Sequence, residues 1–273
     1  MGFFKTLFGG KEESPEEKKK RDDAHDFDVL KTDGVRALHI GQAPYAVKCF
    51  EKALTITDDL ETRDYLAQAL IRCDRLDEAR SQLTVLHEAQ PDNVHILLLM
   101  ARVDYMMEDY SHMAQMCEKA MLIDADNADV MFQYAKASKG QGDVVNAVAM
   151  YTKTIMLNPE LGDAYLERGK LLLSMGDIDG AEEDAVHLME VAPKVADVLL
   201  FRAKVHEARE QLSDAADIYT QAIEVNPFCA EAFKGRGAAR LALGDKDGAE
   251  SDMKQLLEIA PDALNNVSGE YRN

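Results

Sequence analysis

The sequence predicts an all-α protein, built as a linear array of about seven antiparallel helical hairpins. The first observation behind this fold class is a fixed spacing, because Pro159, Pro193, Pro227 and Pro261 are each 34 residues apart. The second is that small residues recur at two fixed places between these prolines. The third is a composition dominated by Ala, Leu, Met, Glu and Asp, which is typical of helical proteins.

The composition also limits the class of partner. The chain has 273 residues, 47% of them apolar, and a net charge of −19, which repels nucleic-acid phosphates and anionic lipid. No apolar run approaches the roughly 20 residues that span a bilayer. The cysteines are scattered without metal or disulfide spacing, as expected for reduced thiols in a cytoplasmic protein. They are Cys49, Cys73, Cys117 and Cys229.

The proline spacing defines units in which proline occupies position 32 of 34. The predicted units are 27–59, 60–93, 94–127, 128–161, 162–195, 196–229 and 230–261. Residues 1–26 are predicted as a flexible charged tail with a short apolar start, and 262–273 as a short C-terminal tail. An alternative for the charged stretch from Glu16 to Asp28 is an extension of the first helix that caps the array.

Columns of equivalent positions explain how each hairpin closes. Position 8 is small in every unit and position 20 in six of seven, so these columns predict where the two helices cross closely. Position 8 holds Gly34, Ala67, Ala101, Ala135, Gly169, Ala203 and Gly237. Position 15 predicts the turn and carries Gly41, Gly142, Gly176 and Gly244. The aspartates after the turn are placed to cap the second helix, and they are Asp109, Asp143, Asp177 and Asp245.

These columns resemble the tetratricopeptide repeat, with small residues at 8 and 20, an aromatic or aliphatic residue at 24 and proline at 32. The third unit departs from the pattern, with Met113, Cys117 and Ala125 at positions 20, 24 and 32. The resemblance implies a right-handed α-solenoid whose first helices line a concave groove. It also implies a non-enzymatic scaffold for protein–protein interaction.

No motif predicts catalysis, a cofactor or a metal. His87-Glu88 and His206-Glu207 do not continue to HExxH, and the histidines share no face. The segments 177–180 and 245–248 look like fragments of calcium loops, but helix capping explains their aspartates. We therefore predict no enzyme activity and no catalytic, cofactor-binding or metal-binding residues.

The candidate binding site is a row of cations in the groove. In the family, positions 5 and 9 of the first helix tend to face the concave surface. Position 9 holds Arg102, Lys136, Lys170 and Lys204, and position 5 of the same units holds Leu98, Phe132, Leu166 and Leu200. Because these positions are one turn apart, they predict an apolar row beside a basic row, suited to a protein or peptide segment with apolar and acidic residues.

An alternative for the same lysines is internal pairing. The candidate acids are Glu167 and the position-2 row of Asp129, Asp163, Asp197 and Glu231. A separate prediction concerns position 7, where arginines face acids at position 23. It pairs Arg168 with Asp184 and Arg236 with Asp252 as structural ion pairs, whereas Arg202 faces Ile218.

The N-terminal segment offers a second candidate contact. Phe3, Phe4, Leu7 and Phe8 form an apolar face that can dock on a membrane or a partner, with a plain tail as the alternative.

Taken together, the sequence predicts a cytoplasmic, non-enzymatic adaptor that holds a partner segment in its groove. Two alternatives stay open. One is a self-associating assembly factor that forms a homo-oligomer through the C-terminal repeat. The other is an accessory subunit that tethers a partner to a membrane through the N-terminal segment.

Overall fold

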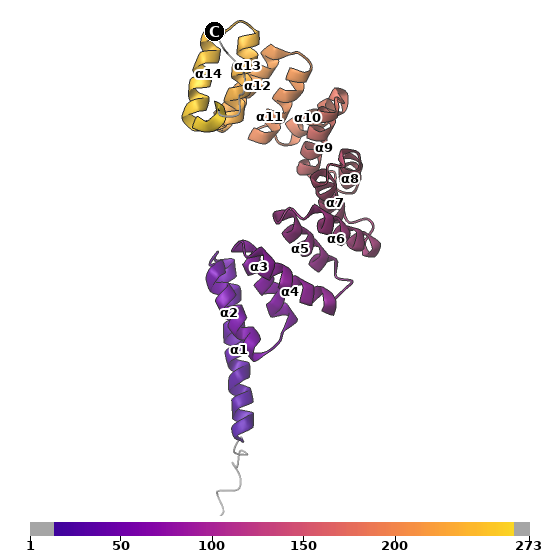
Figure 1. The fold of residues 1–273 in the computed structure, drawn as a ribbon, viewed down its shortest axis with the longest axis vertical. Coiled ribbons are helices and arrows are strands. Elements are labelled where there is room, and N and C mark those ends of the chain that lie inside the picture. Colours follow the sequence, from indigo (N-terminus) through magenta and orange to yellow (C-terminus); the bar gives the residue numbers. More distant parts are fainter. Residues whose placement is uncertain (1–13, 265–273) are drawn as a thin grey trace, which may run out of the picture. The chain divides into compact units, whose positions relative to one another are not determined.

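The computed structural model describes residues 14–264, which form fourteen α-helices and one short 3₁₀ helix, with no strand within that range. The helices are α1 (Pro15–His39), α2 (Ala43–Ile56), α3 (Leu60–Arg72), α4 (Leu76–Ala89), α5 (Val94–Met106), α6 (Tyr110–Ile123), α7 (Ala128–Gly140), α8 (Val144–Leu157), α9 (Gly162–Met175), α10 (Ile178–Val191), α11 (Ala196–Ala208), α12 (Leu212–Val225), α13 (Ala230–Ala242), α14 (Lys246–Ile259) and η1 (Pro261–Leu264). The all-α repeat fold predicted from the sequence is therefore confirmed. Consecutive helices pack against each other as hairpins (Figure 1).

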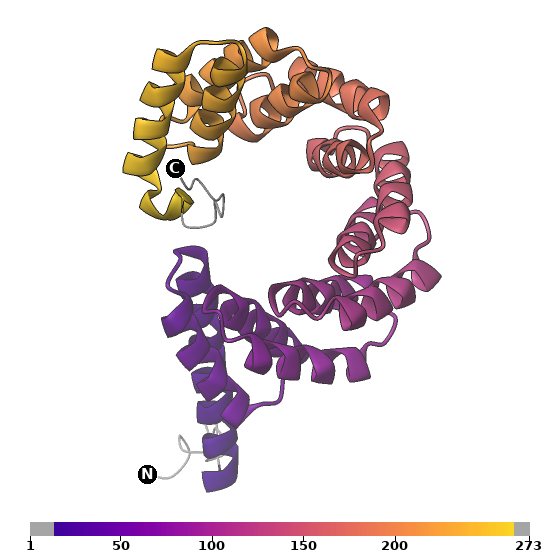
Figure 2. The ribbon, with the colours of Figure 1, turned by 45° about the horizontal axis from the view of Figure 1, so that its top comes forward.

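The chain divides into two compact units, Met1–Ala125 and Asp126–Asn273. The described part of the first unit contains α1–α6, and that of the second contains α7–α14. The division falls at Ala125, which occupies the place where the other later hairpins have proline. Within the second unit, each hairpin packs on the next in sequence order (Figure 2).

The turns follow one local rule. Position 15 adopts a positive φ in all seven units, from 57° at Glu108 to 88° at Gly244. Glycine meets this requirement without strain in four units, whereas Asp74, Glu108 and Glu210 adopt it with a side chain present.

Side-chain caps start the second helices as the sequence predicts. Asp109, Asp143, Asp177 and Asp245 each accept a hydrogen bond from the backbone N–H three residues on. The apparent calcium-loop fragments are therefore helix caps.

The glycines of position 8 leave room for two kinds of neighbour. A Cβ on Gly34 or Gly237 would meet Phe50 or Asp252 of the same hairpin. A Cβ on Gly169 would lie 3.1 Å from Asp184 Cβ of the same hairpin and 2.3 Å from the Phe201 ring of the next one. Gly235, at position 6, leaves room in the same way for Tyr219 of the preceding hairpin, and both rings belong to core clusters.

The first helix is longer than the predicted unit. Residues 15–26 are helical rather than part of a flexible tail, and α1 begins at a capping box in which Ser14 and Glu17 satisfy each other's backbone N–H groups. The alternative that the charged stretch extends the first helix is the correct one. No helix within residues 14–264 combines the length and apolar character needed to cross a bilayer.

Candidate functional site

The arginine of the fifth hairpin is held at a junction. Arg168 Nε donates to Asp184 Oδ2 at 3.0 Å and Nη2 donates to Oδ1 at 2.6 Å, while Nη1 reaches Thr152 of the preceding hairpin at 3.1 Å. Asp184 is 1% exposed. Burial raises the pKa of its carboxyl, and the hydrogen bonds and charge of Arg168 oppose that shift without reversing it.

The seventh hairpin repeats this arrangement. Arg236 contacts Asp252 at 3.0 and 2.6 Å and Thr220 at 3.0 Å, and Arg240 adds a further donor to Asp252. Each arginine therefore joins its own second helix to the second helix of the hairpin before it. Arg202, which lacks an acid at position 23, instead pairs with Glu182 of the preceding hairpin.

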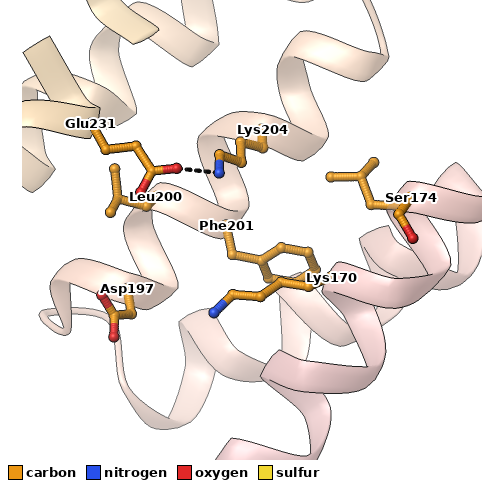
Figure 3. Close-up of a pocket in the computed structure, with 8 residues that line it drawn as sticks. Lys170, Ser174, Asp197, Leu200, Phe201, Lys204 and Glu231 are labelled. Carbon is orange, nitrogen blue, oxygen red and sulfur yellow. Dashed lines mark hydrogen bonds and ion pairs between the residues drawn. The ribbon is translucent and has the colours of Figure 1, made fainter. Parts of the chain in front are cut away.

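Two of the four predicted groove cations line one pocket. Lys170 from α9 and Lys204 from α11 border a pocket of about 350 Å³, together with Leu173, Leu200 and Phe201. Figure 3 shows Lys170, Leu200, Phe201 and Lys204 around this pocket, on neighbouring first helices of the second unit. The pocket thus combines two ammonium groups of position 9 with apolar walls from positions 5, 6 and 12.

The other two cations lie elsewhere. Lys136 is on α7, with its Nζ 6.0 Å from the centre of the Phe132 ring, a cation–π distance. Arg102 is on α5, in the first compact unit.

Acids already accompany the pocket lysines. Lys204 forms an ion pair with Glu231 of α13, drawn as a dashed line in Figure 3. Lys170 Nζ lies 3.5 Å from Glu167, whose other oxygen lies 2.5 Å from Lys139. Burial tends to raise the pKa of Glu167, but the hydrogen bonds and charges of both lysines outweigh it and hold that pKa below its usual range. Internal pairing, the alternative for this row, therefore applies to both pocket lysines.

The apolar row predicted at position 5 is mostly buried, so the prediction of an exposed apolar row is corrected. Leu166 and Leu200 are each 8% exposed and belong to core clusters, and Leu98 and Phe132 are half-buried. Position 5 faces the neighbouring first helix closely enough for most of its side chain to be used in packing between hairpins. Leu200 still borders the pocket, so it contributes a wall rather than an exposed patch.

Five pocket residues were missed as site residues. Leu173, Ser174, Asp197, Phe201 and Glu231 line the pocket from positions 12, 13, 2 and 6. The signal for all but Phe201 was the set of family positions that face the concave surface. The burial and spacing of those four alone do not separate them from ordinary exposed residues.

A second charged cluster lies in the irregular third hairpin. Buried Asp104 accepts from Arg80 Nη2 at 2.5 Å, and its other oxygen lies 2.7 Å from His112 Nδ1. Asp104, Asp109 and His112 are close enough to bind a metal ion. However, Arg80 Nη2 also lies 3.1 Å from Asp109, so a guanidinium already balances both carboxylates.

The apolar N-terminal face of Phe3, Phe4, Leu7 and Phe8 lies outside the described residues. Its proposed docking role stays a prediction.

Comparison with known proteins agrees with this geometry. Residues 200–263 match the family model described as tetratricopeptide repeat, and no curated relative matches the chain. A tetratricopeptide repeat protein from Parabacteroides merdae is 15% identical, with a TM-score of 0.71 over 86% of this chain and 94% of that one. PilW, a type IV pilus biogenesis factor, is 18% identical, with a TM-score of 0.67 over 74% and 94%.

A third similar structure is YrrB, described as a tetratricopeptide repeat protein with an unusual peptide-binding site. It is 16% identical, with a TM-score of 0.56 over 67% of this chain and 94% of that one. At such identities these structures share the fold with this chain, and the fold leaves the ligand open.

The described helices form repeated helical hairpins. Residues 200–263 match the tetratricopeptide repeat model, and the chain shares its fold with solved tetratricopeptide repeat proteins.

Proposed function

We propose that this protein is an adaptor that holds a segment of a partner protein in the pocket between α9 and α11. The observation that carries the proposal is that Lys170 and Lys204 border one pocket with apolar walls. The segment would place an apolar side chain between the helices and a carboxylate beside an ammonium group. Lys136, on α7 of the same unit, extends the same recognition beyond the pocket.

The existing ion pairs are compatible with this role. The Lys204 and Glu231 side chains are 44% and 54% exposed. Exposed pairs contribute only about 0–1 kcal/mol, so a partner carboxylate can replace Glu231 at little cost. A pocket of about 350 Å³ is also large enough for a leucine or phenylalanine side chain.

The test uses a library of fluorescent peptides in which one apolar residue is flanked by acidic, basic or neutral residues. We expect fluorescence polarisation to select the acidic peptides. Replacing Lys136, Lys170 and Lys204 together with Glu should remove that binding while circular dichroism keeps its helical signal. The matched control replaces Lys48, Lys119 and Lys194, three exposed lysines outside the row, with Glu. Unchanged binding by the groove variant, or selection of basic peptides, would contradict the proposal.

A second candidate function is self-association through the C-terminal repeat, which is supported by an apolar groove between α13 and α14.

A cytoplasmic location and a membrane tether formed by Phe3, Phe4, Leu7 and Phe8 are further proposals. Co-sedimentation with vesicles, with and without residues 1–10, separates a tether from a free adaptor. Loss of co-sedimentation on truncation would favour the tether.

A further inference from the structure

The last hairpin exposes a face that is buried in every earlier hairpin. Position 24 is at most 1% exposed in the first six units, at Phe50, Leu83, Cys117, Tyr151, Ala185 and Tyr219. In the last unit it is Met253, which is 43% exposed and borders a groove of about 480 Å³. Phe233 and Leu256 form apolar walls of this groove, and the small residues Gly237 and Ala238 also line it. In five of the six earlier hairpins, the second helix packs against the first helix of the next hairpin.

The first hairpin leaves the opposite face uncovered. Position 3 is at most 4% exposed in the last six units, at Thr62, Ile96, Val130, Ala164, Val198 and Ala232. In the first unit it is Val29, which is 43% exposed. On α1, the face that carries position 3 is therefore exposed, whereas on α11 and α13 the same face packs against the preceding hairpin.

Contacts inside the array show how such surfaces align. At two junctions, the arginine at position 7 donates to a threonine at position 25 of the preceding unit, as Arg168 does to Thr152 and Arg236 to Thr220. In the first and last described hairpins, position 7 of the first unit is Asp33 and position 25 of the last unit is Lys254. The pair that would meet is therefore a carboxylate and an ammonium.

We propose that a second copy of this chain covers the groove between α13 and α14 with its own α1, which produces head-to-tail association. Met253 and the groove walls then pack against the face of α1 that carries Val29. Asp33 of one copy pairs with Lys254 of the other. The contact deepens the second candidate function and does not depend on the pocket between α9 and α11.

The charges around both ends are complementary. Asp33 currently pairs with Arg36 on its own helix at 3.8 Å, and Lys254 pairs with Glu250 on its own helix at 2.8 Å. Asp104 and Arg80 show that position 11 meets position 21 of the preceding unit. Arg36, at position 10, would therefore come close to Glu250 at position 21. Association exchanges two pairs within helices for two pairs between copies.

The wider surfaces follow the same pattern. Lys234 and Lys246 line the groove. Asp22 and Asp26 share a face of α1 with Val29, since they precede it by seven and three residues. A local contact between lysines and aspartates offsets the repulsion between two copies of a chain with a net charge of −19. Because each copy has one face of each kind, the contact yields open chains or closed rings.

The experiment is sedimentation velocity on the 273-residue chain over a concentration series. We expect species larger than the 30.3 kDa monomer that grow with concentration. Lys254→Glu should raise the dissociation constant at least about tenfold, and adding Asp33→Lys in the same chain should restore it by reversing the pair. Lys119→Glu, on an exposed part of α6, is the matched charge control and should leave association unchanged.

Mixing separates head-to-tail contact from other arrangements. Val29→Asp and Met253→Asp should each prevent association alone, because each removes one face. Mixed together they should form a 1:1 dimer and nothing larger, because one intact face of each kind remains. Val145→Asp and Met156→Asp, at exposed apolar positions of α8, control for the added charge. A native chain that stays monomeric at the highest concentration reached, or a Val29→Asp chain that still associates, would overturn the proposal.

Discussion

Two regions of the molecule bury a carboxylate at a junction between hairpins, and they do so differently. In the second unit, Asp184 and Asp252 each meet an arginine from their own hairpin, which also reaches a threonine of the preceding one. In the first unit, Asp104 meets Arg80 of the preceding hairpin and His112 of its own. The arrangement in the second unit recurs at fixed positions. The arrangement in the first unit occurs only in the third hairpin, which departs from the repeat pattern.

The difference shows which part of a repeat is interchangeable. Both regions satisfy the same physical requirement, because a buried carboxylate needs a cation and hydrogen-bond donors. The repeat fixes where the helices lie, so several pairs of positions can supply those groups. Removing the buried carboxylate from each region in turn compares how much each arrangement contributes to the free energy of unfolding.

The largest effect is expected for Asp184→Ala. This change leaves the guanidinium of Arg168, whose side chain is 18% exposed, without its carboxylate. We expect the free energy of unfolding to fall by about 3–5 kcal/mol, measured by urea denaturation. Asp179→Ala removes an acid whose side chain is 91% exposed and should change stability little. Similar losses in both variants would remove the basis for treating the buried pair as structural.

A smaller loss, about 1–3 kcal/mol, is expected for Asp104→Ala, which makes the same change in the irregular hairpin. Arg80 keeps Asp109 as a partner, and its side chain is 30% exposed, so water can solvate part of the guanidinium. The same urea titration measures the difference. A loss equal to or greater than that of Asp184→Ala would show that the third hairpin depends on its cluster as strongly as the regular junctions do.

Gly169→Ala tests the packing beside the regular junction. The added Cβ would lie 2.3 Å from Phe201, so the buried ring must move, at a cost of about 1–3 kcal/mol. The matched change Gly237→Ala meets its nearest atom, Asp252 Cβ, at 3.3 Å and should cost less than about 1 kcal/mol. Thermal unfolding of both variants compares them, and equal shifts would contradict the ring-accommodating role of Gly169.

The smallest effect concerns pH and a half-buried acid on the same helix. The pKa of Glu167 is lowered in the folded protein. Its contribution is therefore fully present above the unfolded pKa of about 4.3 and is lost as the pH falls through the lower folded value. Glu167→Gln should reduce stability at pH 7 by roughly 1 kcal/mol or less and should make no difference near pH 2. A constant difference between the proteins from pH 7 to pH 2 would argue against this origin.

The fold was predictable because the same residue types recur at equivalent positions of successive repeats. Proline spacing, small residues at position 8 and aspartate caps located the hairpins, and arginine opposite aspartate located the pairs at Arg168 and Arg236. The cluster at Asp104 was not predictable, since position 11 is a different residue type in most other units. The burial of Leu166 and Leu200 was also missed, because a column shows which face a residue shares but not how closely the next helix approaches.

The positive φ at position 15 has a dynamic consequence. A glutamate in this conformation costs roughly 1 kcal/mol more than a glycine, so the turns at Glu108 and Glu210 are weaker hinges than those at Gly142, Gly176 and Gly244. In an array held together by neighbour contacts, local opening starts at the weakest links. Amide hydrogen exchange should therefore be fastest around Glu108 and Glu210, and the array opens from within as well as from its ends.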